Sequence, residues 1–335
     1  MKFLRYILFP IMPVYYLVTW LRNSFYNSGA FASKSYSFPV ICVGNLSVGG
    51  TGKTPMIEYL IRLLKDDIFV ATLSRGYKRS TSGFYLADAT ATAKTLGDEP
   101  FQFYNKFKNE ILVAVDANRQ NGIEMLMQHK NAPDAILLDD AYQHRKVQAG
   151  FNILLTTYAD LYINDWVLPT GNLREPRSGA NRADCIVVTK CPENISNSNK
   201  SAIIKKLHAK KHQQIYFSSI CYADKVVSEN KKIALQDLKK FTLVTGIANP
   251  KPLVDYLKNN ALDFEHLSYK DHYNFTDQDI SQLSTKEVIV TTEKDYMRLL
   301  PYKALQAKVF YLPIAISIDN ATAFNRQIKD FVGVK

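Results

Sequence analysis

A glycine-rich loop is the feature of this sequence best suited to do chemistry. Four of the 14 glycines fall between residues 44 and 52, and Lys53 and Thr54 follow at once. Between a strand and a helix, such glycines let backbone N–H groups turn inward around phosphate oxygens, while the lysine adds charge and the threonine hydroxyl reaches Mg2+. The sequence predicts a phosphate loop made of Ser47, Val48, Gly49, Gly50, Thr51, Gly52, Lys53 and Thr54, with Thr54 also at the metal.

Departures from related loops indicate which nucleotide this loop binds. Ser47 stands where the usual pattern has its first glycine, and Val48 stands where ParA-like ATPases carry a signature lysine. The stretch VVTKCP resembles the guanine-reading motif of GTPases, but Pro192 replaces its aspartate. These differences favour ATP, bound with Mg2+, as the cofactor.

An acidic pair provides the second half of a nucleotide site. The apolar run AILLDDAYQH delivers Asp139 and Asp140 to the end of an expected strand. Carboxylate oxygens are suitable ligands for the Mg2+ of a nucleotide. Adjacent side chains on a strand point to opposite faces, so we expect only one of the two to face the metal directly.

Four further clusters carry groups that could handle a phosphate acceptor. Taken singly, each is equally compatible with a helix cap, a surface ion pair or a structural histidine. They are Arg75 in SRGY, Asp98 and Glu99 in LGDEPF, Arg174 and Glu175 in LPTGNLREP, and Asp271 and His272 just before an expected helix start at Thr276.

Alternating strand-like and helix-length segments must position these groups. Apolar runs recur at 39–44, 68–74, 111–116, 135–140, 151–157 and 185–190. This alternation predicts an α/β fold, with a P-loop NTPase-like, mostly parallel sheet that binds ligands at the carboxyl ends of its strands.

The pattern then restarts in the last third of the chain. Strand-like runs at 214–222 and 308–318 flank a smaller unit with apolar runs at 241–246 and 287–295. We therefore expect a second, smaller α/β domain joined by linker strands. The predicted division is 1–23 for an apolar segment, 24–212 for the P-loop domain and 213–335 for the smaller domain and its linkers.

The N-terminus favours contact with a membrane surface. Residues 6–21 are uncharged, and Lys2, Arg5 and Arg22 flank them. The run is short for a membrane span, and Pro10 and Pro13 interrupt it. Its aromatic rings and basic flanks suit an anionic lipid interface. A buried helix hairpin packed on the body of the protein is the alternative.

Composition indicates a globular protein and argues against a zinc-binding or disulfide-rich one. With 47% hydrophobic and 22% charged residues, the chain has the composition of a globular protein. The net charge of +11 indicates an anionic partner, but no nucleic-acid-binding signature appears. The four cysteines form no CxxC pair, which supports neither a zinc site nor a disulfide framework.

Together these motifs resemble one family. The stretches GNLSVGGTGKTP, SRGY, GDEP, DDAYQH, LPTGNLREP, DHYNF and TTEKDYMRL, in that order from residue 44 to 299, are similar to the tetraacyldisaccharide 4'-kinases of lipid A biosynthesis. The resemblance implies transfer of the ATP γ-phosphate to the 4'-hydroxyl of tetraacyldisaccharide 1-phosphate. It also implies a place at the cytoplasmic face of the inner membrane, reached through the N-terminal segment, with no obligatory protein partner inferred.

The resemblance also implies roles for single residues. The family's catalytic Asp–His pair falls on Asp98 and His272, and its phosphate lysine falls on Lys53. Its acidic pair and the LREP motif place Asp139, Asp140, Arg174 and Glu175 near the nucleotide and metal. Our hypothesis is that Asp98 accepts the proton of the sugar hydroxyl late in phosphoryl transfer, while His272 orients Asp98.

A regulatory or chaperone-like NTPase is the competing hypothesis. Such a switch would explain the phosphate loop and the acidic pair, but it would leave Asp98, His272 and the apolar N-terminus without a role.

Overall fold

The computed structural model describes residues 5–271 and 273–334. Within these residues the strands form one sheet of nine strands and one of six. The order in the larger sheet is β15-β8-β7-β6-β1-β5-β2-β4-β3. Its strands are β1 (Val40–Asn45), β2 (Val70–Ser74), β3 (Tyr85–Leu86), β4 (Leu112–Val115), β5 (Ala135–Asp139), β6 (Phe151–Thr157), β7 (Cys185–Thr189), β8 (Gln214–Tyr222) and β15 (Ile314–Ile318).

The larger sheet is parallel from β8 to β4, and its edge strands β3 and β15 are antiparallel to their neighbours. The predicted α/β fold class is confirmed. The central strands are buried on both faces, as expected for a parallel sheet covered by helices. β1, which leads into the phosphate loop, lies between β5 and β6, so the loop emerges at the middle of the sheet edge.

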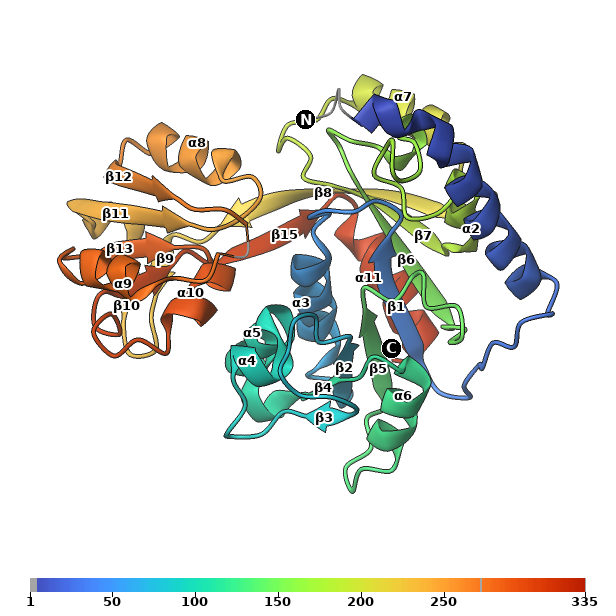
Figure 1. Cartoon of the computed structure of the whole chain (residues 1–335), viewed down its shortest axis with the longest axis horizontal. Coiled ribbons are helices and arrows are strands. Elements are labelled where there is room, and N and C mark those ends of the chain that lie inside the picture. Colours follow the sequence, from blue (N-terminus) through green and yellow to red (C-terminus); the bar gives the residue numbers. More distant parts are fainter. Residues whose placement is uncertain (1–4, 272, 335) are drawn as a thin grey trace.

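Helices cover both faces of this sheet (Figure 1). On one face, side chains of α3 such as Leu60 and of the C-terminal helix such as Phe324 pack with β1 in one core. On the other face, Ile123 of α6 joins a second core. The helices of this unit are α3 (Lys53–Leu64), α4 (Ala93–Leu96), α5 (Asp98–Phe107), η2 (Lys108–Glu110), α6 (Arg119–Met127), η3 (Tyr162–Asn164), η4 (Arg177–Arg182), α7 (Asn197–Leu207) and α11 (Ala321–Val332).

The smaller sheet has its own core and helices. Its strand order is β10-β9-β14-β13-β11-β12, parallel from β14 to β12, and its core includes Leu243, Leu257 and Phe310. The elements are β9 (Lys225–Val227), β10 (Lys232–Ala234), η5 (Leu235–Asp237), β11 (Lys240–Thr245), α8 (Lys251–Asn259), β12 (Asp263–Ser268), α9 (Asp277–Ser284), β13 (Ile289–Thr291), α10 (Glu293–Leu299) and β14 (Val309–Tyr311).

Two antiparallel strands join the units. β8 and β15 pair from Ile314 with Tyr222 to Ile318 with Ser218, and they run together from the larger sheet toward the smaller one (Figure 1). This matches the expected linker strands. The division into 1–23, 24–212 and 213–335 stays a prediction. The packing of α11 on the larger sheet argues for counting the last residues with the first unit.

The N-terminal helix lies along the outside of the first unit (Figure 1). A 3-10 turn, η1 (Tyr6–Ile11), continues into α2 (Met12–Asn27), with Pro13 in the first turn of α2. Most of its large apolar side chains are exposed, including Ile7 at 74% and Val14 at 62%. The alternative of a buried hairpin is therefore wrong. No helix in the described residues is long and apolar enough to cross a membrane.

Candidate active site

The predicted phosphate loop lies between β1 and α3, as expected. Gly49 and Gly52 adopt φ angles of 112° and 91°, which favour glycine because a Cβ would be strained there. α3 begins directly after Gly52, so its first N–H groups point toward the loop and are available to an anion. Thr189 Oγ1, at the end of β7, donates to the loop carbonyl of Thr51 at 2.7 Å. Lys190 Nζ, just after β7, donates to that of Gly50 at 2.6 Å.

Lys53 is held at the loop by acidic and amide groups. Its Nζ lies 3.6 Å from Asp140 Oδ1 and 3.5 Å from Asn45 Oδ1. Arg174 NH1 also donates to Asp140 Oδ1, at 2.9 Å. Burial opposes ionisation of Asp140, but the charges of Lys53 and Arg174 hold the pKa of its carboxyl below the usual value. Asp140 thus keeps the cationic groups of Lys53 and Arg174 together beside the phosphate loop.

Asp139 has the properties of a metal-facing carboxylate. It ends β5, is 2% exposed and accepts a hydrogen bond from Ser74 Oγ at 3.2 Å through Oδ2. Its Oδ1 is buried and has no hydrogen-bond partner in the part of the chain that the structure describes. Burial, followed by the nearby charges of Glu99 and Asp140, raises the pKa of Asp139 to about 7. A divalent cation would satisfy the oxygen and offset this excess negative charge.

Within residues 5–271 and 273–334, no three His, Cys, Asp or Glu side chains converge as a metal site. Beside a nucleotide, Mg2+ is bound through one or two carboxylates together with phosphates and water. The buried Oδ1 of Asp139, without a partner among the described residues, fits such an ion. Asp140 has a positive φ of 48°, which turns the chain directly after Asp139.

The LREP segment closes one side of the phosphate loop. The amide of Val48 donates to the carbonyl of Asn172 at 2.8 Å, and the amide of Arg174 donates to that of Leu46 at 2.7 Å. Ser47 also forms an isolated antiparallel bridge with Leu173. Main-chain hydrogen bonds therefore join the two loops and fix the backbone position of Arg174.

Glu175 is a structural hub of this wall. It is 1% exposed, and Arg182 donates to both of its oxygens, at 2.8 and 2.9 Å. Gln143 Nε2 donates to Oε1 at 3.0 Å, and Asn23 Nδ2 donates to Oε2 at 2.6 Å. These bonds use about four lone-pair positions, all that a carboxylate has. They argue against the expected metal contact at Glu175.

The N-terminal helix reaches the same wall through its polar residues. Tyr15 OH donates to the carbonyl of Arg174 at 2.9 Å, and Arg22 NH2 donates to that of Gln143 at 2.5 Å. Asn23, only 8% exposed, holds Glu175 as described above. One face of α2 is therefore part of the site's framework, while its apolar side chains face outward.

Asp98 lies in the first turn of α5, beside Glu99. Its Oδ2 accepts a hydrogen bond from Nε of Arg298 at 3.0 Å and a second, shorter one from NH2 of the same residue. Arg298 belongs to α10 of the smaller unit. The expected partner of Asp98, His272, lies outside the described residues, and its neighbour Asp271 is exposed. The Asp98–His272 pair therefore stays a prediction.

Basic and neutral groups border the acidic pair. Arg75 follows β2 and is exposed, whereas Arg119 of α6 is 2% exposed. His144 of the DDAYQH motif has a buried Nε2 without a hydrogen-bond partner in the described residues. Burial, then the charges of Arg119 and nearby cations, lowers the pKa of His144 to about 4, so this ring is neutral at pH 7.

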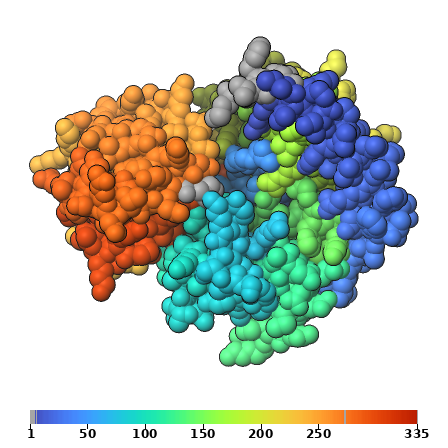
Figure 2. All heavy atoms as spheres, in the orientation of Figure 1, coloured from blue at the N-terminus to red at the C-terminus, as the bar shows by residue number. Residues whose placement is uncertain are grey.

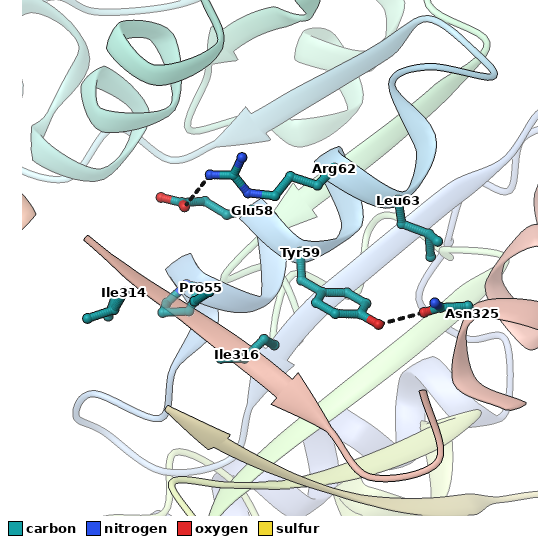
Figure 3. A pocket seen from close by; sticks show the side chains of 9 residues that line it. Pro55, Glu58, Tyr59, Arg62, Leu63, Ile314, Ile316 and Asn325 are labelled. Carbon is teal, nitrogen blue, oxygen red and sulfur yellow. Dashed lines mark hydrogen bonds and ion pairs between the residues drawn. The ribbon is translucent and has the colours of Figure 1, made fainter. Parts of the chain in front are cut away.

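The surface is hollowed between the two units. Figure 2 shows this hollow bordered by orange residues of the smaller unit and by blue and cyan residues of the larger one. A separate cavity of about 360 Å3 lies between α3 and β15, with Glu58, Tyr59 and Arg62 of α3 on its wall (Figure 3). None of the predicted site residues is among the described residues that line this cavity.

Comparison with known proteins decides the family. The model of the tetraacyldisaccharide-1-P 4'-kinase family, LpxK, matches residues 4–333. This chain belongs to that family. The tetraacyldisaccharide 4'-kinase of Flavobacterium johnsoniae is 53% identical, over 96% of this chain and 94% of that protein. The Bacteroides fragilis protein of the same name is 42% identical, over 97% and 92%.

A solved structure of the family has the same fold. LpxK from Aquifex aeolicus, crystallised in complex with ATP, superposes with a TM-score of 0.79 at 29% identity, covering 98% of this chain and 99% of that one. The predicted P-loop NTPase-like fold, with its second unit, is thereby confirmed.

Several residues of the site were not singled out from the sequence. Gln143 lies inside the DDAYQH motif and Arg298 inside TTEKDYMRL, so both were within recognised motifs without an assigned role. Asn23, Asn45 and Arg182 carry no local signal, because their importance depends on partners distant in sequence or on the loop conformation.

Proposed function

We propose that this chain transfers the γ-phosphate of ATP to the 4'-hydroxyl of tetraacyldisaccharide 1-phosphate, giving the 1,4'-bisphosphate precursor of lipid A. The observation that carries the proposal is the family match over residues 4–333, with the phosphate loop intact in its strand–loop–helix setting. A switch NTPase would need neither the acceptor-side carboxylate nor the exposed apolar helix.

The phosphate side of the mechanism is charge neutralisation. ATP binds with its phosphates at the loop, where the first N–H groups of α3 and the ammonium of Lys53 face them. Asp139 and the Thr54 hydroxyl would hold Mg2+ together with the phosphates, and the ion would supply charge stabilisation for phosphoryl transfer. Asp140 and Arg174 fix Lys53 and complete the cationic wall.

The acceptor side depends on a positioned carboxylate. The oxygen of the 4'-hydroxyl attacks the γ-phosphorus, and the bond from phosphorus to the leaving oxygen of ADP breaks. Asp98 accepts the proton that the hydroxyl loses. A loose transition state needs no early deprotonation, so a carboxylate is a sufficient base. His272 orients Asp98 in this proposal.

The outer face of α2 binds the membrane surface. Its apolar side chains form an exposed group that a soluble surface rarely carries, and the exposed Arg5 lies just before them in the chain, where it suits anionic headgroups. The acyl chains of the substrate then stay in the bilayer while the sugar reaches the hollow next to the phosphate loop. In this proposal the enzyme acts at the cytoplasmic face of the inner membrane.

The test is transfer of label from γ-labelled ATP to tetraacyldisaccharide 1-phosphate, with Mg2+ and detergent. We expect a labelled bisphosphorylated lipid from the native protein. Asp98→Ala should reduce turnover by about 10² to 10⁴-fold with little change in apparent ATP affinity. Asp277→Ala is the matched control, since Asp277 is also in the first turn of a helix but is exposed.

Two results would contradict the proposal. Release of inorganic phosphate without a lipid product, from folded native protein, would favour the switch NTPase. Unchanged turnover of Asp98→Ala would leave the kinase activity standing but remove Asp98 from the role of base.

A further inference from the structure

Helices α5 and α10 form a direct contact between the two units, and ion pairs tie both ends of it. Asp98, at the start of α5, pairs with Arg298 near the end of α10. Lys106, near the end of α5, pairs with Glu293 at the start of α10, at 2.5 Å. The two helices therefore run antiparallel, and the smaller unit holds the helix that carries Asp98 at both ends.

On the side of the smaller unit, a chain of hydrogen bonds holds Arg298 in place at Asp98. The Arg298 side chain is only 9% exposed, and its NH1 donates to Asp295 Oδ1 at 3.2 Å. Asp295 is fully buried, and its Oδ2 accepts bonds from the amide of Gly246 at 2.8 Å and from Thr292 Oγ1 at 2.7 Å. Asp295 is thus fixed to Gly246, the residue after β11, and to the N-cap of α10, and it in turn orients the guanidinium that contacts Asp98.

The other end is a buried network. Lys106 Nζ lies 2.6 Å from Glu58 Oε2 as well as next to Glu293, and Gln102 Nε2 donates to Glu58 Oε1 at 2.8 Å. Glu58 belongs to α3, the helix that follows the phosphate loop. Lys106 therefore joins the phosphate-loop helix, the helix of Asp98 and the smaller unit at a single ammonium group.

We propose that Arg298 is a positioning residue of the transfer reaction, which holds the Asp98 carboxylate in its reactive place from the smaller unit. This rests on the proposed function and deepens it, because it makes the placement of the base depend on contact between the units. Arg298 acts through Asp98 and touches neither nucleotide nor acceptor in the proposal.

Stability alone is a poor explanation for this arrangement. Replacing a buried ion pair by well-packed apolar groups is often neutral or stabilising, so an Asp295–Arg298–Asp98 chain is not the cheapest way to join two helices. What the chain adds is direction, because Nε and NH2 of the planar guanidinium both bind Oδ2 of Asp98 and so fix the position of that oxygen. A carboxylate that must face an attacking hydroxyl needs such orientation, since a displacement of about 1 Å can cost roughly 10²-fold in rate.

The experiment compares native protein, Arg298→Met, Arg298→Lys and Arg326→Met in the labelled lipid assay. Arg326 is the matched control, an exposed arginine paired with Asp330 on α11. We expect Arg298→Met to lower kcat by about 10²-fold with the KM for ATP unchanged. We expect added guanidinium ion to restore part of the kcat that Arg298→Met loses. The kcat of Arg298→Lys should lie between those of Arg298→Met and the native protein. Arg326→Met should match the native protein. Thermal unfolding of each variant separates lost positioning from lost folding.

The outcomes are distinct. A folded Arg298→Met protein with native kcat overturns the inference, and so does a loss that appears equally in the KM for ATP and does not respond to guanidinium. If Arg298→Met does not fold, Arg298→Lys decides, and native kcat in that variant overturns the inference. If the native protein itself forms no labelled lipid, the proposed function fails first, independently of Arg298.

Discussion

The two sides of this site are held together in different ways. On the phosphate side, Asn45, Lys53, Asp140 and Arg174 all come from the larger unit, and main-chain bonds join the phosphate loop to the LREP segment. On the acceptor side, Asp98 comes from one unit and its partner Arg298 from the other, 200 positions away in sequence. The first side is rigid by construction, whereas the second is complete only when the units are in contact.

This difference indicates a division of labour. The described contacts of the loop itself and of Lys53 come from the larger unit, and only the helix α3 that follows is linked to the smaller unit, through Glu58 and Lys106, so nucleotide binding should depend little on the smaller unit. Asp98, the proposed base, is in contrast placed by a contact with the smaller unit that any movement of β8 and β15 would alter. Nucleotide binding and acceptor chemistry should therefore respond to different substitutions, and this can be tested.

The largest effect should follow from breaking the phosphate side. Lys53→Ala removes the cation that Asp140 and Asn45 hold at the loop, and we expect kcat/KM to fall by about 10³-fold, the upper range for losing one donor that stabilises charge in the transition state. Because no described contact between the units involves Lys53, the thermal midpoint should change little. Label transfer and nucleotide titration measure both quantities.

Lys65→Met provides the control for Lys53. Lys65 follows the same helix and pairs with Asp66 and Glu110 at the surface. Its loss should leave transfer unchanged. Native activity in Lys53→Ala would contradict the proposed loop chemistry and remove the basis of the comparison.

A smaller effect should follow from changing the exposed apolar surface of α2, which we propose binds the membrane that holds the acceptor. Val14, Leu17 and Val18 of α2 are more than half exposed. Replacing all three with serine should lower partition to anionic vesicles by roughly 10²-fold, counting about 1 kcal/mol for each side chain. Turnover of a detergent-dispersed substrate should change much less, because the polar contacts of Tyr15, Arg22 and Asn23 stay in place.

Vesicle sedimentation measures this partition. Met125→Ser with Ile204→Ser is the control, since both residues are exposed and apolar but lie on α6 and α7. Equal binding of the triple variant and native protein would show that α2 is not the membrane-binding surface.

The same contrast explains what could be predicted from sequence. The phosphate loop, the strand ending at Asp139 and the alternation of strands and helices depend on neighbours in the chain, so local patterns revealed them. Glu175 was expected at the metal because its motif lies beside the nucleotide. Its contacts with Asn23, Gln143 and Arg182 come from three separate segments that no local pattern connects.

Arg298 shows the same limit more strongly. It was visible within TTEKDYMRL, but only the antiparallel packing of α5 on α10 places it against Asp98. Asp139 and Asp140 could be proposed as alternatives for the metal, yet not separated, because their difference depends on a positive φ at Asp140 and on the burial of Asp139. Long-range packing, and not residue type, made these distinctions.

The smallest expected effect tests the contact between the units through its pH dependence. Burial, then the charge of Glu58, raises the pKa of Glu293 to about 7 despite the attraction of Lys106. A carboxyl whose pKa is higher in the folded state adds stability below its unfolded value near 4.5, and this stability is lost as pH rises toward 7. Glu293→Gln removes that dependence while Lys106 keeps Glu58 as its partner. The unfolding free energy of the variant relative to native protein should therefore rise by about 2 kcal/mol between pH 5 and 7.5.

Denaturant unfolding at both pH values, in EDTA, measures this difference, and other titrating groups cancel because both proteins contain them. Glu287→Gln is the control, since Glu287 is exposed and lies just before β13. A difference that does not change with pH would mean that Glu293 stays ionised in the fold, so that Lys106 compensates both acids. The contact would then be a permanent clamp on α5. A difference that rises as expected would mean that ionisation of the buried Glu293 weakens the contact between the units toward neutral pH.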